Sequence, residues 1–242
     1  MMLDYECLMA KIVELDADYT PPIEMAELSN MQSNYASAKT LRSNWMASEA
    51  DEETERNTRE DLMKEILPIF GETITYGKSL MLDKNDLDAL VSVNRVIQGR
   101  KAKAASAANV PDGNGTAPTH TRSNARTSYA ARTGKAAEFV ELVRSNPKFK
   151  ATDDKFKIET FDTRIAKLQN ANTSVIQKEA VRQNLRIMCD NALYLNDDSI
   201  VNSGNSAKNY IKSRFSTRHP IWNQIKNLRF QMPSRLLKKK NK

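Results

Sequence analysis

The sequence predicts an all-α protein made of two related antiparallel helical bundles, an internal duplication, joined by a long basic linker. Three observations favour this fold class. The 242 residues include only seven Gly and 7% aromatic side chains, which disfavours a strand-rich sandwich or barrel. Apolar residues recur at three-and-four spacing, as on the buried face of a helix. Residues 200–230 resemble the earlier residues 74–96, which indicates that one helical unit is used twice.

The repeat defines the predicted domains. Residues 1–99 form the first helical unit, residues 100–135 the linker, residues 136–231 the second unit, and residues 232–242 a basic tail. The linker is rich in Ala, Ser, Thr and Gly and has no apolar periodicity. The aligned pairs of the repeat are Tyr76 with Tyr210, Lys78 with Lys212, Ser79 with Ser213, Met81 with Phe215, Leu87 with Ile221, Val91 with Ile225 and Val96 with Phe230.

In the first half, residues 3–15 form a short amphipathic helix whose inward residues are expected to include Leu3 and Cys7. A long helix follows. Leu67 and Pro68 indicate the start of a third helix, because proline is tolerated in a first turn and disrupts a helix interior. A fourth helix covers residues 86–98.

The second half repeats this order. Residues 136–145 correspond to the first helix, and a long helix follows them. Two shorter helices cover residues 205–215 and 221–228, with a turn at residues 216–220. The stripe of the long helix predicts a face that packs on other helices. Its members are Phe161, Ile165, Leu168 and Val175, then, after a phase slip, Val181, Leu185, Met188, Ala192 and Leu195.

The charge is unevenly distributed. Residues 201–242 contain eleven Lys and Arg and no Asp or Glu, whereas residues 1–200 contain 26 basic and 30 acidic residues. Such asymmetry is an argument about partners rather than about fold. The predicted basic binding residues are Lys208, Lys212, Arg214, Arg218, Lys226, Arg229, Arg235, Lys238, Lys239 and Lys240.

Three interpretations of this basic region stay open. It can dock on acidic helix surface of a neighbouring copy, bind a polyanion through phosphates, or be a solvated face without a partner. The segment 48–65 is acidic and has almost no apolar residue before Leu62, so it is the candidate acidic surface. Its predicted contact residues are Glu49, Asp51, Glu52, Glu53 and Glu55.

Residues typical of catalysis or metal binding are not arranged in a recognisable motif. His120 lies in the linker and His219 in a turn, and neither has a second ligand at helical spacing. Glycine-rich phosphate loops and nucleophile motifs are absent from the sequence. Cys7 and Cys189 are far apart and are expected to be buried, reduced thiols. No cofactor, metal or small-molecule substrate is expected.

The sequence does not predict a membrane protein. No stretch approaches the roughly 18 apolar residues that a membrane helix needs. The N-terminal residues include acids along the whole segment and lack the basic start and apolar run of a signal peptide. The expected location is the cytoplasm.

The second unit also carries a pattern that resembles an uncharacterised family of two-unit helical cytoplasmic proteins associated with Bacteroidota genomes. The first half matches through Val96 to Arg100, and the resemblance covers most of the chain outside the linker. Ser216 departs from the pattern, which has Gly there, and His219 departs where it has Ser. The resemblance implies the fold and assigns no chemistry. The matching residues of the second half are Lys208, Tyr210, Ile211, Lys212, Ser213, Phe215, Pro220, Trp222, Gln224, Ile225, Leu228 and Phe230.

The sequence therefore favours a non-enzymatic structural or interaction protein. Such a protein would self-associate as a homo-oligomer through helical faces and its basic C-terminal unit. The alternative is a nucleic-acid-associated protein that binds the phosphate backbone without sequence specificity.

Overall fold

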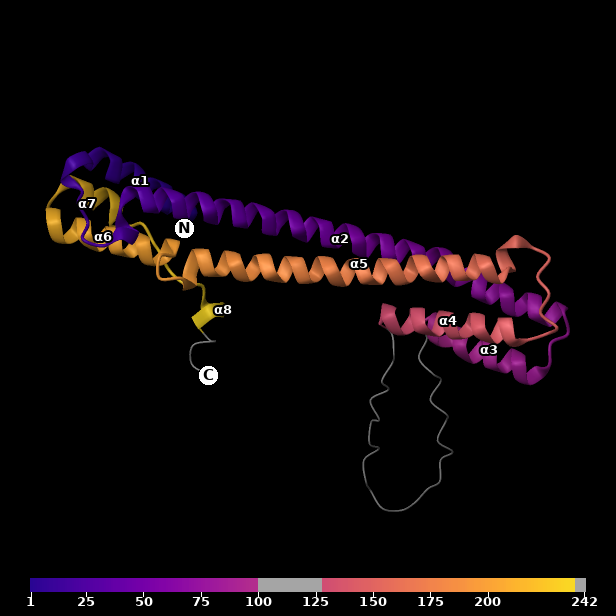
Figure 1. Ribbon diagram of the computed structural model, residues 1–242. Coiled ribbons are helices and arrows are strands. Elements are labelled where there is room, and N and C mark those ends of the chain that lie inside the picture. The colour runs from indigo at the N-terminus through magenta and orange to yellow at the C-terminus, as the bar shows by residue number, and fades with distance from the viewer. Residues whose placement is uncertain (100–127, 238–242) are drawn as a thin grey trace, which may run out of the picture. The chain divides into compact units, whose positions relative to one another are not determined.

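The computed structural model describes residues 1–99 and 128–237, and all regular elements within these residues are helical (Figure 1). Linker residues 100–127 and the predicted binding residues Lys238, Lys239 and Lys240 lie outside the described residues. The all-α prediction is confirmed.

The first half contains three α-helices: α1 (Met2–Leu15), α2 (Leu28–Ser79) and α3 (Lys84–Ile97), with short 3-10 helices η1 (Asp16–Asp18) and η2 (Glu24–Ala26) before α2. The second half begins with α4 (Tyr129–Ser145), the 3-10 helix η3 (Asp154–Phe156) and α5 (Ile158–Asp190). It continues with a π-helix, η4 (Asn191–Leu195), and then with α6 (Ile200–Phe215), α7 (Pro220–Ile225) and α8 (Ser234–Leu237).

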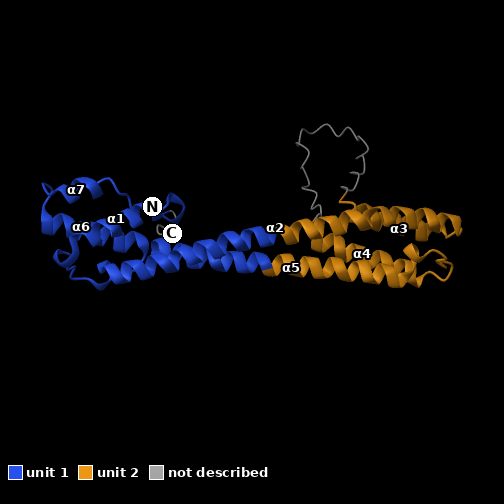
Figure 2. Cartoon of the chain, turned by 90° about the horizontal axis from the view of Figure 1, so that it is seen from above, with its two compact units in different colours: residues 1–52, 178–242 blue, residues 53–177 orange. Residues whose placement is uncertain are grey.

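The chain forms two compact units, and each unit combines segments of both sequence halves (Figure 2). Unit 1 contains residues 1–52 and the described residues from Lys178 onward, and unit 2 contains residues 53–177. The helices α2 and α5 contribute to both units. The compact units therefore differ from the sequence-defined division at residues 99 and 136, because each half places its first helix in one unit and its long helix continues into the other.

Unit 1 is built on apolar side chains from α1, α6 and α7. Tyr5, Leu8 and Ile12 of α1 are buried at helical spacing. They form one core with residues of α6 and α7 and with Phe230. The Tyr5 hydroxyl lies 2.7 Å from Ser203 Oγ of α6, so the polar end of this core tyrosine has a partner.

Unit 2 is built on three phenylalanines. The ring of Phe70 in α2 lies 4.9 Å from that of Phe139 in α4 and 6.0 Å from that of Phe161 in α5. Leu90, Val93 and Ile97 on one face of α3 join the same core.

The same contact between opposite halves occurs once in each unit. In unit 1, Tyr210 of α6 packs edge-on against Tyr19, with ring centroids 5.4 Å apart, and its hydroxyl accepts from Thr20 N at 3.3 Å. In unit 2, Tyr76 of α2 packs edge-on against Phe149 at 5.6 Å, and its hydroxyl accepts from Thr152 N at 3.4 Å. Tyr76 and Tyr210 are the residues that the sequence repeat aligns.

The expected helix start at Pro68 is wrong, because α2 continues through this residue. Proline inside a helix removes one backbone hydrogen bond and costs about 3 kcal/mol. Phe70 and Ile66 flank it and are buried, and burial of such a side chain contributes about 1.5–3 kcal/mol. Gln98 Nε2 also donates to the Leu67 carbonyl at 2.9 Å, which ties this turn of α2 to the end of α3.

Two further expectations need correction. Cys7 is exposed and Leu3 is 70% exposed, because Tyr5, Leu8 and Ile12 occupy the inward face of α1. Cys189 is buried, and both thiols are free. The predicted C-terminal boundary of the linker, residue 135, is wrong, because residues 129–135 already form the first turns of α4.

Ser216 has a positive φ of 62°, a backbone conformation that glycine adopts without strain. The turn that follows α6 therefore holds a non-glycine residue in a conformation that favours glycine.

Gly204 of α6 provides a test of the unit 1 core. A Cβ at this position would lie 2.9 Å from Cγ of the buried Phe230 ring. We expect Gly204→Ala to lower the free energy of unfolding by about 1–3 kcal/mol, because the ring must shift. Gly71→Ala in α2 is the matched control, since nothing lies within 4 Å of its Cβ. It should stabilise by about 0.5–1 kcal/mol. Urea denaturation measures both, and equal effects would contradict this account.

Candidate interaction surfaces

Four of the exposed predicted basic residues lie around the end of α6 and around α7 and are grouped here by their place on the surface. Lys212 and Arg214 lie in the last turn of α6, where positive charge is favourable to the helix dipole. Arg218 lies in the following turn and Arg229 after α7, and both are exposed. We call these four residues the basic surface.

Lys208 has a different role from the basic surface. Its Nζ donates to the carbonyls of Lys226 and Leu228, at 2.7 Å each, and lies 5.8 Å from the Trp222 ring. Burial lowers the pKa of Lys208. This side chain fastens the segment after α7 to α6, so it serves the fold.

The remaining predicted basic residues make local contacts. Lys226 Nζ donates to Asn223 Oδ1 at 3.0 Å. Arg235 of α8 forms an ion pair with Asp190 at the end of α5. The structure therefore divides the predicted set into an exposed surface, structural contacts and the tail residues that it does not describe.

The predicted acidic residues lie on α2, and two of them pair with α5. Asp51 accepts from Lys178 Nζ at 2.8 Å, and Glu52 accepts from Arg182 Nε. The Glu52 side chain is only 4% exposed. Glu49 and Glu53 are exposed and Glu55 is half-buried. Glu52 is therefore not available to a neighbouring copy, because α5 already supplies its basic partner.

The sequence contained a signal for these ion pairs. Lys178 and Arg182 are four residues apart on α5, so they share a helix face, and Asp51 and Glu52 are adjacent on α2. Only the side-by-side placement of α2 and α5 in unit 1 identifies which acids and bases meet.

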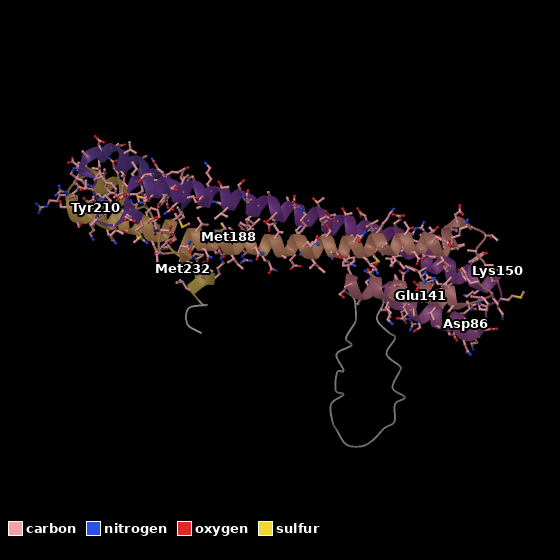
Figure 3. All side chains as sticks on the ribbon, viewed as in Figure 1. Asp86, Glu141, Lys150, Met188, Tyr210 and Met232 are labelled. Carbon is pink, nitrogen blue, oxygen red and sulfur yellow. The ribbon has the colours of Figure 1, made fainter. Side chains whose placement is uncertain are left out.

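Part of the α5 stripe is not covered by the described residues. Val181 is 49% exposed and Met188 is 51% exposed. Leu195, at the end of the π-helix, is 46% exposed. The expectation that these residues pack on other helices is not met within the described chain, because Cys189 and Leu193 take the inward positions. Met188 is labelled on α5 in Figure 3.

Unit 1 also contains a cavity of about 230 Å³ that the sequence did not indicate. It lies between the N-terminal part of α1, α2, the end of α5, η4 and α8. Its lining includes three arginines, Arg42, Arg186 and Arg235, together with Trp45 and Tyr194. Arg186 and Cys189 of α5 and Leu193 of η4 follow at three-and-four spacing, which is the signal in the sequence that places them on one side.

The described residues contain neither a candidate metal site nor a candidate membrane-spanning helix. No cluster of three or more His, Cys, Asp and Glu side chains that could hold a metal ion occurs there. None of the described helices combines the length and the apolar character that crossing a membrane requires. His219 accepts a hydrogen bond from Ile221 N at 3.3 Å and so caps α7.

The chain is an all-helical protein whose described surface carries these candidate interaction sites. Comparison with protein-family models, with curated proteins and with solved structures gives no significant match.

The buried acid Glu52 can be tested directly. Glu52→Gln removes the negative charge that Arg182 pairs with, so we expect a loss of about 1–3 kcal/mol in unfolding free energy. Glu53→Gln, at the exposed neighbouring position, should change stability by less than about 0.5 kcal/mol. Chemical denaturation measures both variants. Equal stability of the two variants would show that the Glu52 pair is not structural.

Proposed function

We propose that this protein has a non-enzymatic, structural or interaction role and self-associates through helical faces. The observation that carries the proposal is the partly uncovered stripe of α5, with Val181 and Met188 about half exposed. Exposed apolar side chains in a row are typical of a surface that a partner covers.

The spacing of the stripe favours a second copy of this chain as the partner. Val181, Leu185, Met188 and Ala192 alternate four-and-three spacing, which is the heptad arrangement of helices that pack along their length. In a symmetric dimer the same stripe comes from both copies, so one sequence pattern supplies both sides of the interface.

A surface depression next to the stripe extends this region. It has a volume of about 370 Å³ and is lined by Met188 and Ala192 together with Leu41 of α2. The rest of its lining is polar and includes Asn34 and Asp198. Interfaces between proteins usually combine apolar side chains with a polar rim.

We also infer that the chain arose by internal duplication of one helical unit, as in the two-unit family that the sequence resembles. The paired contacts of Tyr76 with Phe149 and of Tyr210 with Tyr19 support this inference. In both, a tyrosine of one half covers an aromatic side chain of the other half. Two copies of the chain could make the same contacts if the segments were exchanged between the copies.

The basic surface can contribute to association by contacting acids of a second copy. Glu49 and Glu53 are exposed and are available for this, whereas Asp51 and Glu52 already pair with α5. Exposed ion pairs are screened by salt, so this contribution would weaken as the ionic strength rises.

Met188→Glu tests self-association through the α5 stripe. We expect it to shift the oligomer to monomer, because burying an unpaired carboxylate in an apolar interface is costly. Ile187→Glu is the matched control, since Ile187 is 57% exposed on the same helix but lies off the stripe. It should leave the oligomer intact. Light scattering after size exclusion measures the mass at low and high salt.

A strictly monomeric wild-type protein at micromolar concentration and low salt would refute the proposal. An oligomer that survives Met188→Glu but dissociates in high salt would assign association to the charged residues and remove the stripe from the interface.

A second candidate function is binding to the phosphate backbone of nucleic acid. The observation that favours it is the exposure of Lys212, Arg214, Arg218 and Arg229 in a segment without acids. Phosphate contacts of this kind give salt-dependent binding with little sequence preference.

For this candidate, we expect Arg214→Gln combined with Arg218→Gln to weaken binding to a labelled duplex and to reduce the salt slope by about 0.9 for each phosphate that is no longer neutralised. Lys178→Gln is the control, because Lys178 pairs with Asp51 and lies outside the basic surface. Fluorescence anisotropy across a salt series measures both. Absence of wild-type binding at about 50 mM salt would exclude the candidate.

A further inference from the structure

The cavity in unit 1 brings positive charge and an aromatic ring to the same place. Arg42 and Trp45 are three residues apart on α2, so both project on the same side of that helix. Arg186 reaches the cavity from α5, and Arg235 reaches it from α8. Met1 and Met2 supply apolar surface, and Arg42 Nη1 lies 3.7 Å from Met2 Sδ.

The side chains that line the cavity include more basic than acidic groups. Asp190 is the acid among the cavity's lining residues, and it pairs with Arg235. Arg42 and Arg186 are exposed, and neither forms an ion pair with this acid. The cavity therefore has an excess of positive charge from two guanidinium groups, each able to bind a carboxylate or phosphate with two hydrogen bonds.

The other titratable side chains of the lining add no negative charge at neutral pH. Burial raises the pKa of the Cys189 thiol and of the Tyr194 hydroxyl, so both groups stay protonated. An anion in the cavity would meet no repulsion from these two groups.

Trp45 contributes an aromatic ring to the lining of the cavity. Its Nε1 is buried and has no hydrogen-bond partner among the described residues. Because this N–H is buried, a molecule in the cavity would contact the apolar part of the indole ring.

The backbone that borders the cavity also has an unusual conformation. The cavity lining residues Leu193 and Tyr194 belong to the π-helix η4, which follows α5 directly. A π-helical turn is rare and occurs frequently at functional sites. Here it brings Leu193 into the core of unit 1 and Tyr194 to the cavity.

We propose that this cavity is a binding site for a small organic anion, in which Arg42 and Arg186 hold a phosphate or carboxylate group and Trp45 contacts a compact apolar body. A cavity of about 150 Å³ is sufficient to hold benzene, so about 230 Å³ accommodates one ring with one anionic group. The site is independent of the α5 stripe and of the basic surface.

Phenyl phosphate is the probe that matches both parts of the site. The titration uses the full chain with Trp222→Phe, which leaves Trp45 as the single tryptophan reporter. We expect a saturable change in tryptophan emission and a rise in melting temperature with phenyl phosphate. Phenol and inorganic phosphate, which carry the two parts separately, should each bind at least about tenfold more weakly.

Arg42→Gln and Arg186→Gln should each weaken phenyl phosphate binding by about tenfold or more, because each removes a charge-assisted contact. Arg214→Gln, an exposed arginine of the basic surface, is the matched control and should bind as the parent does. The thermal shift gives a second readout, since a ligand of the folded state raises its stability.

Two outcomes would overturn the proposal. One is the absence of a saturable change in both emission and melting temperature up to about 10 mM phenyl phosphate. The other is equal affinity in the parent, in Arg42→Gln and in Arg186→Gln, because the arginines would then have no part in binding. Equal binding of phenol would likewise exclude recognition of an anion.

Discussion

The structure depends on apolar packing between segments that come from opposite halves of the chain. In each compact unit, the first helix and the aromatic turn residue of one half are buried by the later helices of the other half. Tyr210 over Tyr19 and Tyr76 over Phe149 are the contacts that repeat. Each unit therefore packs an aromatic side chain of one half under a tyrosine of the other half. The helices α2 and α5 contribute to both units.

Charge has two separate roles in this chain. Lys178 and Arg182 of α5 pair with adjacent acids of α2, and Glu52 is almost completely buried in doing so. A buried ion pair contributes less net stability than its Coulomb energy suggests, yet removal of one partner is costly. It therefore fixes how α2 and α5 are aligned in unit 1. The exposed arginines near α7 have no such role in the fold, and they are the residues proposed to contact phosphates or the acids of a second copy.

The cavity illustrates how a site arises from residues with no motif. Arg42 and Arg186 are far apart in the sequence, and nothing in the residues around either one distinguishes it from other exposed arginines. They line one cavity together with Trp45, and the proposal is that they contact the same ligand there. If the cavity binds an anion, ligand binding would stabilise unit 1, because the lining comes from both halves.

The sequence alone determined the all-helical class, the repeat that pairs Tyr76 with Tyr210, and the acid-free C-terminal segment, because these follow from spacing and composition. It could not determine that α2 continues through Pro68, since this depends on burial of Phe70 against Phe139 and Phe161. Nor could it determine which of the predicted charged residues serve the fold, as Lys208 and Glu52 do. Only the tertiary structure decided these points, because each depends on side chains that are distant in the sequence and meet after folding.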